Sequence, residues 1–175
     1  LSPFCMDLRH LAISDFKTAS GSVQDIQLSY QVLGKPLHTA PIVLVNHALT
    51  GNSNVAGKDG WWSDLIGDGK CIDTEKYTIL SFNIPGNGFD GFVIDNYKDF
   101  VAADIARIFL WGLEQLNIEK LFVIIGGSLG GGIAWEMAAL NPNITEHLIP
   151  VASDWKSTDW LIANCQIQEQ FLVNS

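Results

Sequence analysis

The chain has 175 residues, of which 47% are hydrophobic and 17% charged, enough for one globular domain that buries about 70% of its unfolded surface. A formal net charge of −9 disfavours nucleic acids and anionic membranes as partners, and no uncharged apolar run reaches the roughly 18 residues of a membrane span. The first residues lack the basic start and long apolar centre of a signal peptide, so we expect a cytoplasmic location.

The cysteines and histidines form no pattern typical of a metal site. The cysteines are odd in number, far apart and without a CxxC pair, which indicates reduced thiols. They are Cys5, Cys71 and Cys165. The four histidines do not cluster with acidic residues at ligand spacing either, so we expect no metal.

The N-terminal half predicts a hairpin followed by two buried strands. Residues 26–32 alternate between apolar and polar side chains, as a half-buried strand does. A weaker alternation at about 13–19 predicts an antiparallel neighbour, with the turn at residues 20–22. Continuous apolar runs at 42–45 and 77–82 are typical of strands covered on both faces.

The C-terminal half alternates between helical and strand patterns. The expected elements are a helix over about 97–116, a strand over 121–125, a helix over about 129–140, a strand over 147–151 and a helix over about 158–173. Strands that alternate with helices imply an α/β fold, with a mostly parallel sheet and helices on both faces. In such sheets, functional sites gather at the carboxyl ends of the strands.

A lone serine lies between a predicted strand and a predicted helix, in the sequence Gly126-Gly127-Ser128-Leu129-Gly130. This context fits a nucleophile elbow, where the serine occupies a strained turn and glycines let strand and helix approach each other. The alternative is a glycine-rich phosphate-binding loop. However, no lysine follows as in a Walker loop, and the spacing does not match GxGxxG. We therefore favour the elbow, with Ser128 as the nucleophile.

A serine nucleophile also needs backbone donors that stabilise the oxyanion. In an elbow, one donor is the amide of the residue after the serine, here Leu129. The second donor comes from the loop after an earlier strand. The segment 46–51 occupies that place, and we select the amide of Leu49.

The sequence offers no credible general base. His47 lies on the correct rim, but we favour a structural role in which loop hydrogen bonds hold its ring and the ring shapes the oxyanion turn. His147 opens a parallel strand, so it should lie near the opposite edge, roughly 17 Å away at ~3.3 Å per residue. Asp154 is a candidate acid after the last strand, although we favour a turn role. A nucleophile without its base and acid indicates a chain that is cut short.

Three stretches together carry a resemblance to a known family. They are Asn46-His47-Ala48-Leu49-Thr50-Gly51, Gly60-Trp61-Trp62 with Leu65-Ile66-Gly67, and Gly126-Gly127-Ser128-Leu129-Gly130-Gly131. From about Ile26 onward, the chain resembles homoserine O-acetyltransferase, a family with the α/β-hydrolase fold. Residues 162–168 are similar to the start of the family's helical lid. We expect the two tryptophans to pack a short helix onto the core, with lining of the substrate cavity as the alternative.

The resemblance implies a ping-pong reaction without a bound cofactor. Ser128 would take an acetyl group from acetyl-CoA and pass it to the γ-hydroxyl of L-homoserine, feeding methionine synthesis. Leu49 and Leu129 map onto the oxyanion-hole positions. The triad Asp and His, the rest of the lid and the contacts of a full-length homodimer would lie beyond residue 175. The implied division is 1–157 for the N-terminal part of the hydrolase core and 158–175 for the start of the lid.

Other functions stay open on the sequence alone. A serine esterase or another amino-acid O-acyltransferase of this fold would use the same nucleophile and oxyanion hole. A non-catalytic, truncated remnant would explain the missing base and acid. We expect little turnover from the 175-residue chain by itself, because serine without its base is a poor nucleophile.

Overall fold

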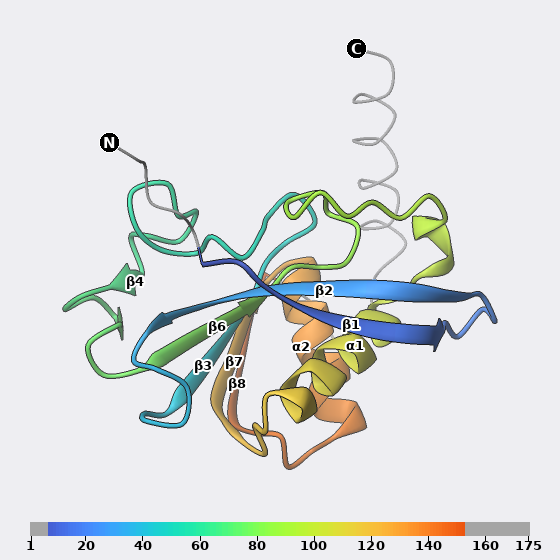
Figure 1. Cartoon of the computed structure of the whole chain (residues 1–175). Helices are drawn as coiled ribbons and strands as arrows, with labels where there is room; N and C mark the ends of the chain where they lie inside the picture. The colour runs from blue at the N-terminus through green and yellow to red at the C-terminus, as the bar shows by residue number, and fades with distance from the viewer. Residues whose placement is uncertain (1–6, 153–175) are drawn as a thin grey trace.

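The computed structural model describes residues 7–152, which contain a six-stranded sheet and two α-helices (Figure 1). The sheet has the order β1-β2-β6-β3-β7-β8. Its strands are β1 (Arg9–Lys17), β2 (Val23–Gly34), β3 (Ile42–Asn46), β6 (Thr78–Phe82), β7 (Leu121–Gly127) and β8 (Thr145–Val151). The other elements are the short strands β4 (Ile66–Gly67) and β5 (Ile72–Asp73), the 3-10 helix η1 (Tyr97–Asp99), and the helices α1 (Ala102–Gln115) and α2 (Leu129–Leu140).

The first two strands form the antiparallel hairpin that the alternating pattern predicts. Ile13 pairs with Ile26, and both side chains are buried. The turn closes where the Thr18 N–H donates to the Ser22 carbonyl at 2.9 Å, and Gly21 takes a φ of 97°, which glycine adopts without strain. Because β2 pairs antiparallel with β6, the hairpin extends the main sheet.

Four strands of the sheet are parallel neighbours, namely β6, β3, β7 and β8. Every residue of β3 and β6 is buried, as expected for strands that are covered on both faces. The prediction of an α/β fold with a mostly parallel sheet is therefore confirmed. The helix expected over 158–173 and the lid segment expected at 158–175 lie outside the described residues.

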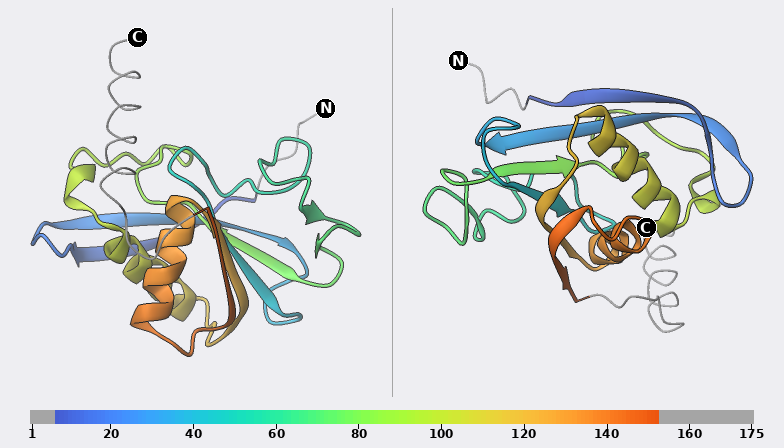
Figure 2. Two further views of the ribbon diagram at one scale, coloured as in Figure 1. Left: turned by 180° about the vertical axis from the view of Figure 1, so that it is seen from behind. Right: turned by 90° about the horizontal axis from the view of Figure 1, so that it is seen from below.

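Both α-helices cover the same face of the sheet and pack against each other (Figure 2). The apolar stripe of α1 and the first three turns of α2 close over one buried cluster. Members of this cluster are Leu44, Phe82, Phe109, Ile124 and Met137. The cluster makes α1 and α2 a single layer, which fixes where α2 begins relative to the sheet.

The opposite face of the sheet is covered without an α-helix in the described range. Val55 and Ile66, from the segment between β3 and β6, pack there in a second buried cluster with the sheet. Gly57 and Gly69 in this segment have positive φ angles of 82° and 68°, which a right-handed helix does not contain. Within residues 7–152, helices thus lie on one face rather than on both.

Trp61 and Trp62 lie in this segment but not in the short helix that we expected. Residues 61–65 form turns that lead directly into β4 at Ile66. Trp62 packs against the second cluster and stacks on Trp61, with ring centroids 4.8 Å apart. The Nε1–H of Trp61 donates to the Asn52 carbonyl at 2.8 Å. The pair therefore joins the covering segment to the loop after β3.

The helix expected over 97–116 is interrupted near its start. After η1 the chain is extended at Val101 (φ −115°, ψ 166°), and α1 begins at the next residue. The buried carboxylate of Asp104 holds this start, since its Oδ2 accepts the Val101 N–H at 3.0 Å. Its Oδ1 accepts the Ala19 N–H at 2.9 Å, and Arg107 lies 3.5 Å away. Asp104 thus joins α1 to the hairpin.

Replacement of this carboxylate should destabilise the fold. Asp104→Ala leaves two backbone N–H groups without their acceptor, and we expect the free energy of unfolding to fall by about 2–4 kcal/mol. Asp104→Asn keeps one acceptor oxygen and should lose less. Denaturant unfolding measures both, with Asp64→Ala at an exposed position as the control. A loss no greater than that of the control would contradict this role.

Candidate active site

The carboxyl ends of three parallel strands lie level at one edge of the sheet (Figure 1). Asn46, the last residue of β3, pairs with Gly126 of β7, and Leu44 of β3 pairs with Leu80 of β6. The loops that follow β3, β6 and β7 therefore share one rim. This is the edge where α/β sheets carry their sites.

Ser128 occupies the turn between β7 and α2, as the elbow predicts. Its φ of 52° and ψ of −117° place a non-glycine residue in a region that costs roughly 1–3 kcal/mol. The Ser128 N–H donates to the Val151 carbonyl at 2.9 Å, and its carbonyl accepts the Gly132 N–H at 3.1 Å. The residue is exposed. A strained, solvent-accessible serine at the start of a helix has the geometry of a nucleophile.

Two glycines make this turn possible by their lack of a side chain. A Cβ at Gly126 would lie under 3.0 Å from the backbone of Gly130 in α2. A Cβ at Gly130 would also lie under 3.0 Å from two atoms, the carbonyl oxygens of Asn46 and His47. By contrast, a Cβ at Gly127 would meet nothing within 4 Å. The first turn of α2 therefore packs directly onto the chain that leaves β3.

The two predicted donors of the oxyanion hole lie on either side of this contact. Leu129 is the first residue of α2, so its N–H has no acceptor within the helix. Leu49 lies three residues after the end of β3, is 63% exposed, and its N–H bonds to none of the described residues. The Asn46 Nδ2 donates to the Gly130 carbonyl at 3.3 Å and joins the two segments. The assignment of both amides as oxyanion donors stays a prediction.

His47 is buried, and both of its ring nitrogens have backbone partners. The Ile84 N–H donates to Nε2 at 2.9 Å, and Nδ1 lies 2.6 Å from the Ala48 carbonyl oxygen. Burial lowers the pKa of His47 below its ordinary value, which the bond to Ala48 partly offsets. The expectation that loop hydrogen bonds hold the ring is confirmed, and Nε2 is therefore not available to take a proton from Ser128.

His147 and Asp154 do not complete the site. His147 is exposed in β8, where it pairs with Val123 and packs edge-on against Phe122 with ring centroids 5.1 Å apart. It lies four positions before Val151, the residue that bonds to the elbow, in an extended strand. The expectation that His147 opens its strand is wrong, because β8 begins at Thr145 and His147 is its third residue. Asp154 lies outside the described residues.

The sequence analysis did not predict a buried polar network between the loops after β3 and β6. Asn83, directly after β6, accepts the Ser53 N–H at 2.8 Å and donates through Nδ2 to the Ser29 and Ser53 hydroxyls, each at 2.9 Å. The Ser53 hydroxyl donates to Gln31 Oε1 at 2.6 Å, and Asn87 Nδ2 donates to Asn83 Oδ1 at 3.1 Å. The signal available in the sequence was Asn83, a polar residue directly after the buried strand β6. The network joins the loops after β3 and β6.

The described residues hold no group of three or more His, Cys, Asp or Glu side chains that could bind a metal ion. Cys71 is an exposed free thiol, while Cys5 and Cys165 lie outside the described range. Between residues 7 and 152, no helix is long and apolar enough to cross a membrane.

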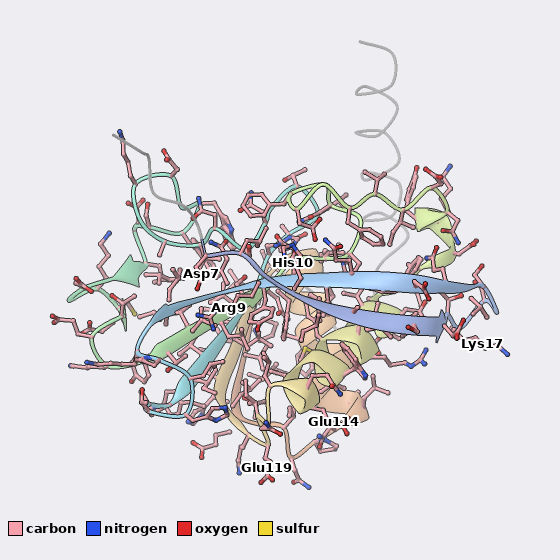
Figure 3. All side chains as sticks on the ribbon, in the orientation of Figure 1. Asp7, Arg9, His10, Lys17, Glu114 and Glu119 are labelled. Carbon is pink, nitrogen blue, oxygen red and sulfur yellow. The ribbon has the colours of Figure 1, made fainter. Side chains whose placement is uncertain are left out.

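A hollow of about 690 Å³ lies far from the elbow, at the C-terminal ends of α1 and α2. Its lining includes Trp111, Glu114 and Glu119. Figure 3 labels the two glutamates at the end of the molecule where β7 begins, opposite the rim. The hollow is therefore separate from the candidate active site.

Burial of His47 should make stability depend on pH. Because its pKa is lower in the folded state than the ordinary 6.5, the unfolded chain binds more protons below that pH. The contribution of His47 is complete above about pH 6.5 and falls on acidification, by at most ~1.4 kcal/mol per pH unit. Denaturant unfolding between pH 8 and 5 should show a steeper loss for the wild type than for His47→Asn. Parallel curves would contradict it.

Comparison with known proteins agrees with this architecture. A family model described as the alpha/beta hydrolase fold matches residues 41–164. The homoserine O-acetyltransferase of Corynebacterium diphtheriae is 36% identical over 172 residues, which cover 89% of this chain and 44% of that relative. The chain thus spans less than half the length of this curated relative.

Solved structures give the same result. The crystal structure of homoserine O-acetyltransferase from Staphylococcus aureus matches with a TM-score of 0.77 and 29% identity, covering 93% of this chain and 51% of that one. Esterase E22 matches with a TM-score of 0.77 and 27% identity, covering 90% and 50%. The chain belongs to the α/β-hydrolase family and is similar to the N-terminal portion of the homoserine O-acetyltransferases.

Proposed function

We propose that the protein containing this chain is an acyltransferase that moves an acetyl group from acetyl-CoA to the hydroxyl of L-homoserine. The observation that carries the proposal is the strained, exposed Ser128 at the elbow. It lies in a chain that is 36% identical to a homoserine O-acetyltransferase over most of its length. The product would feed methionine synthesis, and the proposal includes a cytoplasmic, homodimeric full-length enzyme.

In the first half-reaction, Ser128 Oγ attacks the thioester carbonyl and loses its proton. The carbonyl oxygen becomes an oxyanion, which the N–H groups of Leu49 and Leu129 stabilise together with the N-terminus of α2. When the tetrahedral intermediate collapses, the carbon–sulfur bond breaks and CoA leaves as the thiol, leaving acetyl on Ser128. A small-molecule acyl donor therefore suffices, without a bound cofactor.

In the second half-reaction, the homoserine hydroxyl attacks the seryl ester at the same carbonyl. The same two amides stabilise the second oxyanion, and Ser128 is released as a free hydroxyl with O-acetylhomoserine as product. Each step needs a group that carries a proton. Neither His47 nor His147 is placed for this, so the proposal assigns the base and its acidic partner to residues outside the described range.

Removal of the nucleophile tests the reaction. In the full-length protein, Ser128→Ala should lower kcat for acetyl transfer by at least ~10⁴-fold, because a nucleophile and its base act as a unit. Incubation with acetyl-CoA alone should acetylate Ser128 of the wild type, detected by peptide mass spectrometry. Ser20→Ala, in the distant hairpin turn, should leave kcat unchanged. An active, acetylated Ser128→Ala variant would refute the seryl intermediate.

The second candidate is a serine esterase, which the likeness to esterase E22 favours. Both functions share the acyl-enzyme and differ in what accepts the acetyl group. With acetyl-CoA and homoserine together, a transferase releases O-acetylhomoserine in excess over acetate. If acetate forms at the same rate whether or not homoserine is present, the protein is an esterase and not the proposed transferase.

A further inference from the structure

We propose that His47 is a positioning residue for the oxyanion hole, because its neutral ring fixes the peptide that carries the Leu49 N–H. This inference deepens the proposed function and rests on it, since the Leu49 amide matters only if Ser128 forms a tetrahedral intermediate. His47 itself touches no reacting atom. It acts through the backbone of the two residues that follow it.

The partners of the ring assign its proton. The Ile84 N–H is a donor, so Nε2 must carry a lone pair. The Ala48 carbonyl oxygen, 2.6 Å from Nδ1, is an acceptor, so Nδ1 must carry the hydrogen. Only the neutral Nδ1–H form satisfies both contacts. If Nε2 were protonated, its N–H would face the Ile84 N–H, and two donors would lie together without an acceptor.

The bond to Ala48 fixes the direction of the Leu49 amide. The Ala48 C=O and the Leu49 N–H belong to one planar trans peptide and point in opposite directions. The Ala48 oxygen accepts both the His47 Nδ1–H and the Gly51 N–H, the latter at 2.9 Å. Two donors on this oxygen restrict rotation of the peptide. The Leu49 N–H therefore points away from the ring and stays free for an anion.

The ring itself is held by the loop after β6. Its Nε2 bonds to Ile84, and two further contacts join the same pair of loops. Asn83 Oδ1 accepts the Ser53 N–H at 2.8 Å, and Asn87 Nδ2 donates to the Gly51 carbonyl at 3.4 Å. The turn that carries Leu49 is thus bonded at its start, middle and end to one neighbouring loop. His47 is the member of this set that reaches the Leu49 peptide.

Two substitutions separate the two contacts of the ring. His47→Asn keeps an N–H donor near the position of Nδ1 and loses the acceptor for Ile84. His47→Gln keeps an acceptor near the position of Nε2 and loses the donor for Ala48. If the Ala48 bond positions the oxyanion donor, His47→Gln should lose more activity than His47→Asn. A role in packing alone predicts similar losses in both.

The measurement uses the full-length protein with two reactions, acetyl transfer to homoserine and hydrolysis of p-nitrophenyl acetate. Loss of one oxyanion donor lowers kcat by ~10²–10³-fold, so we expect His47→Gln to approach this range with KM little changed. His47→Asn should retain at least about tenfold more activity than His47→Gln. The matched control His10→Gln, on exposed β1, should keep wild-type kcat. Nitrogen-15 NMR of the wild type should show the His47 proton on Nδ1.

The inference is overturned if His47→Gln keeps kcat within about threefold of the wild type, or if the two variants lose kcat equally. It is also overturned if the NMR spectrum places the proton on Nε2. A wild type that hydrolyses p-nitrophenyl acetate but does not acetylate homoserine refutes the proposed function alone. In that case the ester reaction and the NMR spectrum still decide the role of His47, because both need only Ser128 and the oxyanion loop.

Discussion

The close approach of α2 to the end of β3 is the constraint on which the candidate site depends. Gly130 lies against the carbonyl groups of Asn46 and His47, where any side chain would collide with backbone. This contact places the first amide of α2 beside the loop after β3, although Leu49 and Leu129 are 80 positions apart in sequence. It also requires a sharp turn out of β7, which Ser128 makes at positive φ. One packing distance thus sets both the exposed hydroxyl and its neighbouring donors.

A strained turn persists only when its surroundings hold it. Here the elbow is bonded on both sides: the Ser128 N–H to Val151 of β8, and the Ser128 carbonyl to Gly132 of α2. The loop after β3 is held differently, by the buried network of Asn83, Ser53 and Gln31. Fully bonded polar groups in a low-dielectric interior are rigid, whereas an unpaired one would be costly. Backbone hydrogen bonds from β8 and α2 therefore hold Ser128, whereas side-chain hydrogen bonds hold the loop after β3.

Much of this arrangement follows from patterns in the sequence. Continuous apolar runs identified β3 and β6. The glycines around Ser128 identified the elbow, because only residues without a side chain let the strand and the helix approach each other so closely. The start of α1 was not predictable, since Asp104 looks like any helix-surface acid until its contact with Ala19 across the hairpin is known. The turns at residues 61–65 were missed for the same reason: short segments follow tertiary contacts, here that of Trp61 with Asn52, more than local pattern.

The behaviour of His47 shows why residue type alone does not assign a role at this rim. A histidine at the carboxyl edge of an α/β sheet suggests a base, yet a base needs a free nitrogen that faces the nucleophile. In this structure the ring is buried, and each of its nitrogens contacts a backbone group. Burial further favours the neutral ring by lowering its pKa. Histidine carries a donor and an acceptor on one rigid ring, which makes it a good proton carrier. Here the same two groups link two loops by hydrogen bonds. The base that the proposed function requires would have access to Ser128, because that residue is exposed.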